Sequence, residues 1–292
     1  MQASTLRPGQ RQIPFKSLVP FLLITFGLTW AILALLILFT EPIERIFGEL
    51  SSRHPLFVLA VYAPAIATFI IVTYHTGLRG LRQYFTRLLL WRCPAAWVAF
   101  LLLGVPLMFV VGALWKGNLL SYRFPFDSFQ AAAVALAWLI ILGPIEEFGW
   151  RGFALPLLQR RFAPIWSGLI LGVIWGVWHL PAFLLSGTPQ SAWSFSPFFM
   201  GTIALSVIVT PLFNASRGSI LLPALFHFQL INPMWPDAQP YDTAVVILVA
   251  AVVVWLNRKA MFSRRNAITA VVPGGERSVS HVVACSKENA QP

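Results

Sequence analysis

Long apolar runs separated by short polar loops dominate the chain, and this pattern predicts membrane-spanning helices. A helix needs about 20 apolar residues to cross the hydrocarbon core of a bilayer. We predict eight spans, the last two shorter than this length, at about residues 18–39, 57–74, 97–115, 129–160, 165–185, 197–213, 219–231 and 244–256. The predicted fold class is therefore all-α, a polytopic integral membrane protein.

The composition agrees with this reading and divides the chain into three regions. Of the 292 residues, 58% are hydrophobic and 11% are charged, whereas a soluble domain carries about a quarter charged residues. A soluble core is therefore excluded. We expect residues 1–16 to form a cytoplasmic tail, residues 17–262 to form the transmembrane domain, and the polar residues 263–292 to form a disordered cytoplasmic tail. Cys93 and Cys285 have neither disulfide nor metal-ligand spacing.

The net charge of +11 follows membrane topology rather than nucleic-acid binding. Basic residues gather in short clusters between the apolar runs, in the N-terminal region and in the loops at 79–92, 160–161, 217 and 258–265. The intervening loops are acidic, mixed or neutral. Loops rich in Lys and Arg stay on the cytoplasmic side. We therefore predict an integral protein of the plasma (inner) membrane with both termini cytoplasmic, with the lipid bilayer rather than nucleic acid as a partner.

A few polar residues interrupt the apolar runs. Of the ten acidic residues, only Glu146 and Glu147 lie inside such a run. Charged groups within a membrane cost at least a few kcal/mol and usually have a function. The same placement selects five more polar side chains within spans or at their ends: Arg151, His179, His227, Asn214 and Asn232.

Helical spacing separates the two glutamates. Glu147 and Arg151 are four residues apart in the order that favours an ion pair, so we expect this pair to form. Glu146 points about 100° away and has no local cation. It would suit a general base with a water and a histidine beside it. The alternative is that both glutamates belong to a buried charge cluster that holds the helices together.

The depths of the candidate residues favour a long fourth helix. His179 lies ~21 Å from the cytoplasmic end of its span, and Glu146 reaches the same depth only if its helix continues to Arg160. We therefore predict a tilted helix of about thirty residues, bent near Pro156. His227 would lie ~12 Å deep on the same measure.

Three segments resemble the motifs of one membrane-protein family. Residues 146–151 resemble its EExxxR motif, and Trp175 to His179 resemble its motif of an aromatic residue, three residues and a histidine. Residues 214–227, from Asn214 to His227, resemble its third block. This is the CPBP family of intramembrane glutamic endopeptidases, which includes the type II CAAX prenyl endopeptidases and bacterial relatives linked to bacteriocin processing or immunity. The resemblance covers about residues 130–235.

The resemblance implies an eight-helix membrane fold with its active site inside the bundle. It also implies hydrolysis of a peptide bond without a metal or cofactor, on a membrane-associated or lipidated (CAAX-type) peptide or protein. By this resemblance Glu146 and His179 activate water and His227 helps to bind the oxyanion. Glu147 and Arg151 have supporting or orienting roles.

The chain departs from the family pattern after the third motif. The family usually has an asparagine four residues after the histidine of that motif. Here the fourth residue is Ile231, and the asparagine is Asn232. One position rotates a side chain by 100° on a regular helix, so Asn232 could serve only if Pro233 distorts the helix. Asn214, at the start of the third block, is the other supporting candidate.

Two other classes of function fit the same residues. Glu146, His179 and His227 could form a metal site, since two imidazoles and a carboxylate are a common ligand set. The protein could instead be a non-catalytic immunity or scaffold protein, or a proton-coupled carrier that uses intramembrane Glu and His side chains.

Overall fold

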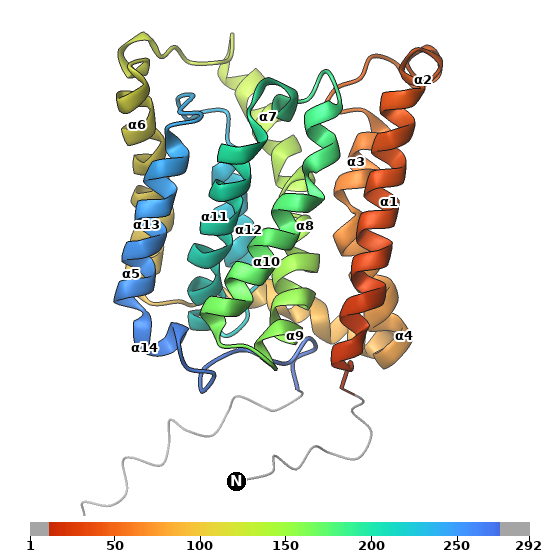
Figure 1. Cartoon of the computed structure of the whole chain (residues 1–292), viewed down its shortest axis with the longest axis vertical. Coiled ribbons are helices and arrows are strands. Elements are labelled where there is room, and N and C mark those ends of the chain that lie inside the picture. The colour runs from red at the N-terminus through yellow and green to blue at the C-terminus, as the bar shows by residue number, and fades with distance from the viewer. Residues whose placement is uncertain (1–11, 275–292) are drawn as a thin grey trace, which may run out of the picture.

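The structure, a computed structural model, describes residues 12–274 as a helix bundle (Figure 1). All regular elements in this range are helical, which agrees with the predicted all-α class. The elements that run along the bundle are α1 (Leu18–Leu38), α4 (Ala63–Phe85), the run α5 (Ala95–Ala99), η3 (Phe100–Gly104) and α6 (Val105–Lys116), the run α7 (Phe129–Leu142), α8 (Glu146–Gly149), η5 (Trp150–Ala154) and α9 (Leu155–Gln159), then α10 (Pro164–Trp178), α11 (Phe195–Ala215) and α13 (Asp242–Leu256).

Shorter helices occupy the ends and the interior of the bundle. They are η1 (Phe15–Ser17), α2 (Thr40–Phe47), α3 (Pro55–Val61), η2 (Thr86–Leu89), η4 (Leu119–Ser121), η6 (Leu180–Leu184), η7 (Pro189–Ala192), α12 (Leu221–Leu230) and α14 (Arg258–Met261). We call the end that holds α14 and the end of α9 the basic end, and the end that holds α2 the distal end (Figure 1).

Five helices in the described range are long and apolar enough to cross a membrane. They cover Phe15–Leu38, Ala95–Lys116, Phe129–Gln159, Pro164–Leu184 and Phe195–Ala215. A sixth span is formed if Pro55–Val61 and Ala63–Leu89, which are bent by 53°, are taken as one. The last two predicted spans correspond to α12 and α13, which are shorter apolar helices. The protein is thus a polytopic integral membrane protein, and the count of eight crossings stays a prediction.

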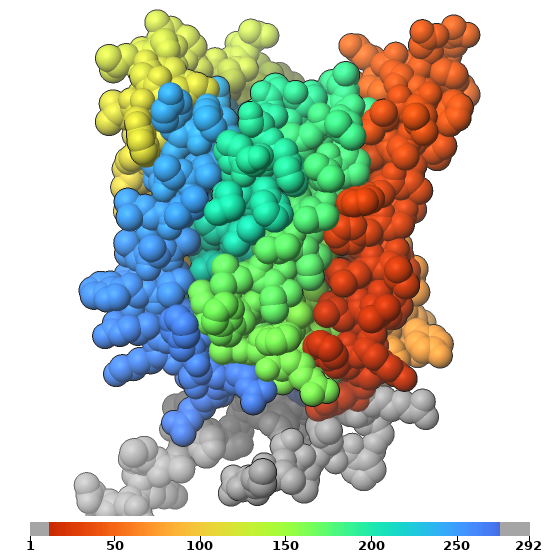
Figure 2. Space-filling model, viewed as in Figure 1, coloured from red at the N-terminus to blue at the C-terminus, as the bar shows by residue number. Residues whose placement is uncertain are grey.

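The outer surface of the bundle suits a bilayer. On one face α1, α10, α11 and α13 form a continuous wall (Figure 2). Large apolar side chains such as Leu35, Leu248 and Trp255 are exposed on these helices. Apolar groups facing outward along a span lie against lipid tails rather than water.

The predicted long fourth helix is present as a run of 31 residues, Phe129–Gln159. It is irregular at two places. A turn at Gly143 and Pro144 separates α7 from α8, and η5 is a π-helical segment that ends at Ala154, two residues before Pro156. The expected bend near Pro156 stays a prediction, although the π-helical segment lies close to that residue, and the sequence analysis missed the turn at Gly143. Both irregularities flank the paired glutamates, and π-turns often occur at functional sites.

Close approaches of backbones fix the helices that carry the polar residues. In α10, Gly168, Gly172 and Gly176 recur every four residues, the small-residue spacing that lets membrane helices approach closely. A Cβ on Gly172 would lie 2.7 Å from the Cα of Ile203 in α11. A Cβ on Gly149 in α8 would likewise lie 2.7 Å from the carbonyl oxygen of Pro64 in α4. Neither position has room for a larger side chain.

A segment near the C-terminal end of the described range docks against the basic end of the bundle. Asn214 Oδ1 accepts a hydrogen bond from the Ile268 amide at 3.0 Å, and Gln159 Nε2 donates to the Ile268 carbonyl at 2.9 Å. Arg87 Nε donates to the Val271 carbonyl at 3.0 Å, and Val271 is only 1% exposed. We call residues 267–272 the docked segment.

The predicted tails differ from this structure near their inner limits. A disordered tail was expected from Ser263 because the sequence there is polar and poor in aromatic residues, but buried polar groups of the bundle bind the backbone of the docked segment. At the other terminus Ile13, which was placed in the N-terminal tail, is buried. The rest of both predicted tails, residues 1–11 and 275–292, lies outside the described residues.

Candidate active site

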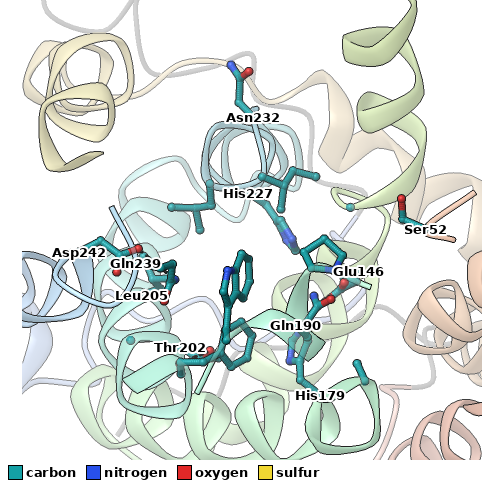
Figure 3. Close-up of a pocket in the computed structure, with 18 of the residues that line it drawn as sticks. Ser52, Glu146, His179, Gln190, Thr202, Leu205, His227, Asn232, Gln239 and Asp242 are labelled. Atoms are coloured by element: carbon teal, nitrogen blue, oxygen red, sulfur yellow. Dashed lines mark hydrogen bonds between the residues drawn. The ribbon is translucent and has the colours of Figure 1, made fainter. Parts of the chain in front are cut away.

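A cavity of about 580 Å³ contains the three residues that the sequence analysis selects as catalytic candidates. Glu146 at the start of α8, His179 at the C-terminal end of α10 and His227 in α12 all line it (Figure 3). Apolar and aromatic residues make up most of the remaining wall, including Trp175, Trp178 and Phe198. Three segments that are distant in sequence therefore meet at one chamber inside the bundle.

Glu146 is held by two indole groups. Its Oε2 accepts a hydrogen bond from Trp175 Nε1 at 2.8 Å and a longer one from Trp150 Nε1 at 3.4 Å. Neither His179 nor His227 hydrogen-bonds Glu146 directly within residues 12–274. The sequence analysis missed both indole donors. Trp150 could have been found, because it lies four residues after Glu146 on the same helical face.

Glu147 joins an arginine and a histidine. Arg151 donates from Nη1 to Glu147 Oε1 at 3.0 Å, which confirms the predicted ion pair. His227 Nδ1 lies 2.8 Å from the same oxygen, a contact that the sequence analysis did not predict. All three side chains are buried, and the Arg151 guanidinium also lies 4.4 Å from the centre of the Trp175 ring. Glu147 therefore orients His227 as well as neutralising Arg151. It contacts one of the catalytic candidates directly, which its expected supporting role did not include.

His179 is oriented by the end of its own helix. Its Nδ1 lies 2.7 Å from the carbonyl oxygen of Trp175. A carbonyl only accepts, so Nδ1 carries the hydrogen and the lone pair of a neutral ring is on Nε2. Trp175 thus contacts Glu146 through its indole and His179 through its backbone. This shared neighbour brings Glu146 and His179 to the same part of the cavity wall, and their equal depth in the membrane stays a prediction.

Packing at Gly143 fits the other histidine into the wall. An ideal Cβ on Gly143 would lie 3.5 Å from His227 Nε2 and 2.3 Å from the terminal carbon of Ile231. The missing Cβ of Gly143 therefore leaves room for Ile231, and the imidazole lies beside the glycine at ordinary van der Waals distance. With Nδ1 bound to Glu147, the other ring nitrogen faces Gly143 at the cavity wall.

Within residues 12–274 neither asparagine candidate hydrogen-bonds a catalytic candidate, although Asn232 lines the same cavity. Asn232 lies just beyond α12, and its Oδ1 accepts a hydrogen bond from the Met234 amide at 3.0 Å. Its amide points away from Glu146 and His179 (Figure 3). Asn214 lies at the basic end, where it binds Gln159 and the docked segment. The irregular end of α12 does not correct the one-residue displacement of Asn232, and the position four after His227 is filled by the apolar Ile231.

The alternative of a metal site needs Glu146, His179 and His227 to converge on one point. Within residues 12–274, no three His, Cys, Asp or Glu side chains are grouped closely enough to hold a metal ion. The carboxylate of Glu146 is instead directed at indole donors, and Nδ1 of His227 is directed at Glu147. This donor geometry gives the metal-site interpretation no support.

Comparison with known proteins supports the resemblance that the three motifs indicate. Residues 128–232 match a family model described as type II CAAX prenyl endopeptidase Rce1-like. A CAAX prenyl protease 2 of Methanococcus maripaludis is 29% identical over 185 residues, which cover 59% of this chain. The match spans 65% of that relative, slightly less than two thirds of its length. The predicted resemblance to the CPBP family of type II CAAX prenyl endopeptidases is thus confirmed, and it is concentrated on the segments that build the cavity.

Proposed function

We propose that this chain is an intramembrane endopeptidase that uses a glutamate and histidines to hydrolyse a peptide bond. Both comparisons support the type II CAAX prenyl endopeptidase family. The observation that carries the proposal is the convergence of Glu146, His179 and His227 on one chamber within the bundle. The substrate would be a membrane-associated or lipidated peptide. The reaction consumes one water and yields a carboxylate and an amine.

Glu146 and His179 would activate the water. Trp175 fixes the carboxylate of Glu146 with its indole and the ring of His179 with its carbonyl. A water between them could give its proton to Glu146 while its oxygen attacks the carbonyl carbon of the peptide. The free Nε2 of His179 would orient the same water. Glu146 would then deliver the proton to the departing amine.

His227 would stabilise the oxyanion. This role needs a proton on Nε2, and therefore a doubly protonated imidazolium, because Nδ1 donates to Glu147. Glu147 Oε1 supplies the counter-charge beside that ring. Donors directed at a developing oxyanion are worth several kcal/mol in known proteases. Glu147 and Arg151 are in this account positioning residues for His227.

The test is cleavage by purified protein in detergent. A pooled library of membrane-anchored peptides is incubated with wild-type protein or with Glu146→Gln, and the products are read by mass spectrometry. We expect Glu146→Gln to lose about 10²- to 10⁴-fold in rate, the range for a general base. Cleavage by the wild type in the presence of a chelator distinguishes this mechanism from a metal protease. Equal cleavage by wild type and Glu146→Gln would contradict the proposal.

A non-catalytic membrane protein is the second candidate, and Asn232 is the observation that favours it. The amide expected beside the oxyanion points elsewhere and is bound to Met234. A protein of the bacteriocin-immunity kind could keep the chamber without completing the catalytic set. Comparison of membrane peptides from cells with and without the protein would separate the two candidates, because only a protease leaves new peptide termini.

The proposed setting is the plasma membrane. The basic end, with the inner limits of both predicted tails, would face the cytoplasm, and the helical domain would cover residues 17–262. The distribution of Lys and Arg supports this orientation.

A further inference from the structure

The cavity extends toward one end of the bundle only. Its wall begins in the middle, at Glu146, Trp175 and Leu205, and continues to loops at the distal end. Those loops contribute Ser52, three residues of the 189–193 loop (Pro189, Gln190 and Trp193) and all of residues 232–239 except Met234. Three of these lining residues, Pro189, Pro233 and Asp237, are exposed. The chamber therefore reaches the surface at the distal end.

The basic end of the bundle is closed by packing. Val271 of the docked segment and Ile13 belong to the same buried cluster as Tyr84, Phe153 and Leu157. Arg87 is buried and donates to the carbonyls of Gly218, Ala270 and Val271. Arg160 Nε donates to the Thr269 carbonyl at 2.8 Å. None of these residues lines the cavity.

Charge separates the same two ends. Among the described residues, the basic end carries no Asp or Glu, and its Lys and Arg residues are Lys16, Arg79, Arg82, Arg87, Arg92, Arg160, Arg161, Arg217, Arg258, Lys259, Arg264 and Arg265. The distal end has mixed charge, with Glu41, Glu44, Glu49, Asp127, Asp237 and Asp242 beside Arg45, Arg53, Lys116 and Arg123. Because Lys and Arg are concentrated at the basic end, this end is predicted to face the cytoplasm.

We propose that the substrate enters from the distal, non-cytoplasmic end, and that it is the outward-facing part of a membrane-associated peptide rather than a lipidated C-terminus in the cytoplasm. This inference rests on the proposed function. The walls near the opening are rich in aromatic residues, including Phe198, Trp193 and Trp235, so the chamber takes an apolar stretch of the peptide. The side-chain amide oxygen of Gln190 is available to its backbone (Figure 3).

The route is tested by cysteine labelling, which needs no enzymatic activity. Ser52→Cys and Gln190→Cys are made separately in a Cys93→Ser/Cys285→Ser background and exposed to a membrane-impermeant maleimide. Lys259→Cys, an exposed position in α14 at the basic end, is the matched control. We expect labelling of residues 52 and 190 in intact cells, and labelling of residue 259 only in inverted membrane vesicles. Labelling of residues 52 and 190 only in inverted vesicles, or in neither preparation, would overturn the proposal.

Blocking the opening links the route to cleavage. In detergent both ends are accessible, so Gln190→Cys and Lys259→Cys can each be assayed before and after reaction with a bulky maleimide. We expect the adduct at residue 190 to abolish cleavage and the adduct at residue 259 to leave it unchanged. Loss of cleavage on labelling residue 259 alone would overturn the route. If unlabelled protein in detergent cleaves nothing, the proposed protease function fails, and the labelling pattern still decides which end is open.

Discussion

Removing the charge of Glu147 tests how the buried cluster of Glu147, Arg151 and His227 works. Glu147→Gln keeps the shape of the side chain but leaves the Arg151 guanidinium, which is 1% exposed, without the anion that it pairs with at 3.0 Å. Taking one partner from a buried ion pair costs about 3–5 kcal/mol. At about 2–4 °C per kcal/mol, the unfolding midpoint should fall by roughly 6–20 °C.

The same substitution should also slow cleavage, because His227 loses the carboxylate at its Nδ1. A hydrogen bond to a charged group is worth about 1.5–3 kcal/mol, which corresponds to roughly 10- to 150-fold in rate. Stability and activity can be separated with the double variant Glu147→Gln/Arg151→Met. It removes both charges, so the unfolding midpoint should recover, whereas cleavage should stay low because the carboxylate beside His227 is still missing.

Thermal unfolding in detergent and initial cleavage rates of folded protein are the two measurements. Recovery of both properties in the double variant would show that Glu147 acts only by neutralising Arg151, and would refute its role in positioning His227. An unchanged unfolding midpoint in Glu147→Gln would refute the argument from a buried uncompensated charge.

Three further outcomes follow from contacts elsewhere. Gly149→Ala should lower the free energy of unfolding by about 1–3 kcal/mol, since the new Cβ meets the Pro64 backbone at 2.7 Å. The matched control is Gly27→Ala in α1, where a Cβ has nothing within 4 Å, and its thermal unfolding midpoint should not fall. Asn232→Ala should reduce cleavage less than about tenfold, the equivalent of 1.4 kcal/mol, and a larger loss in initial rate would mean that Asn232 turns toward the substrate. Arg87→Gln should release the docked segment, seen as faster proteolysis after Arg264 or Arg265, whereas Arg92→Gln, at an exposed position without such contacts, should not.

The sequence predicted what depends on local spacing. The apolar runs placed the helices, and the four-residue interval placed Arg151 beside Glu147. Contacts between helices were harder, because they depend on how each helix is rotated about its axis. The contacts of His227 with Glu147 and of Trp175 with Glu146 both join different helices in this way. Asn214 shows the same limit, since a motif position gave its place in the chain but not the partner, the docked segment, that its side chain binds.

Composition gave the wrong prediction for the docked segment, because its backbone rather than its side chains supplies the binding groups. Residues 267–272 have few features that predict order, and their side chains are mostly small or β-branched. What binds them is the pair of buried donors Arg87 and Gln159, which need carbonyl acceptors, together with the partly exposed Arg160. No pattern within the docked segment reports those donors, because they lie more than a hundred residues earlier in the chain.

The docked segment also sets an order of assembly. Arg87, Gln159 and Asn214 enter the membrane well before residues 267–272 are synthesised, because chains emerge from their N-terminal ends. Until then their polar groups lack the acceptors and donors that they have in the finished bundle. Closure of the basic end is therefore among the last steps of biogenesis. A truncated chain that ends at Phe262 and has left the ribosome would hold every helix of the described range with this end still open, so proofreading proteases of the membrane could tell it from a chain with the docked segment in place.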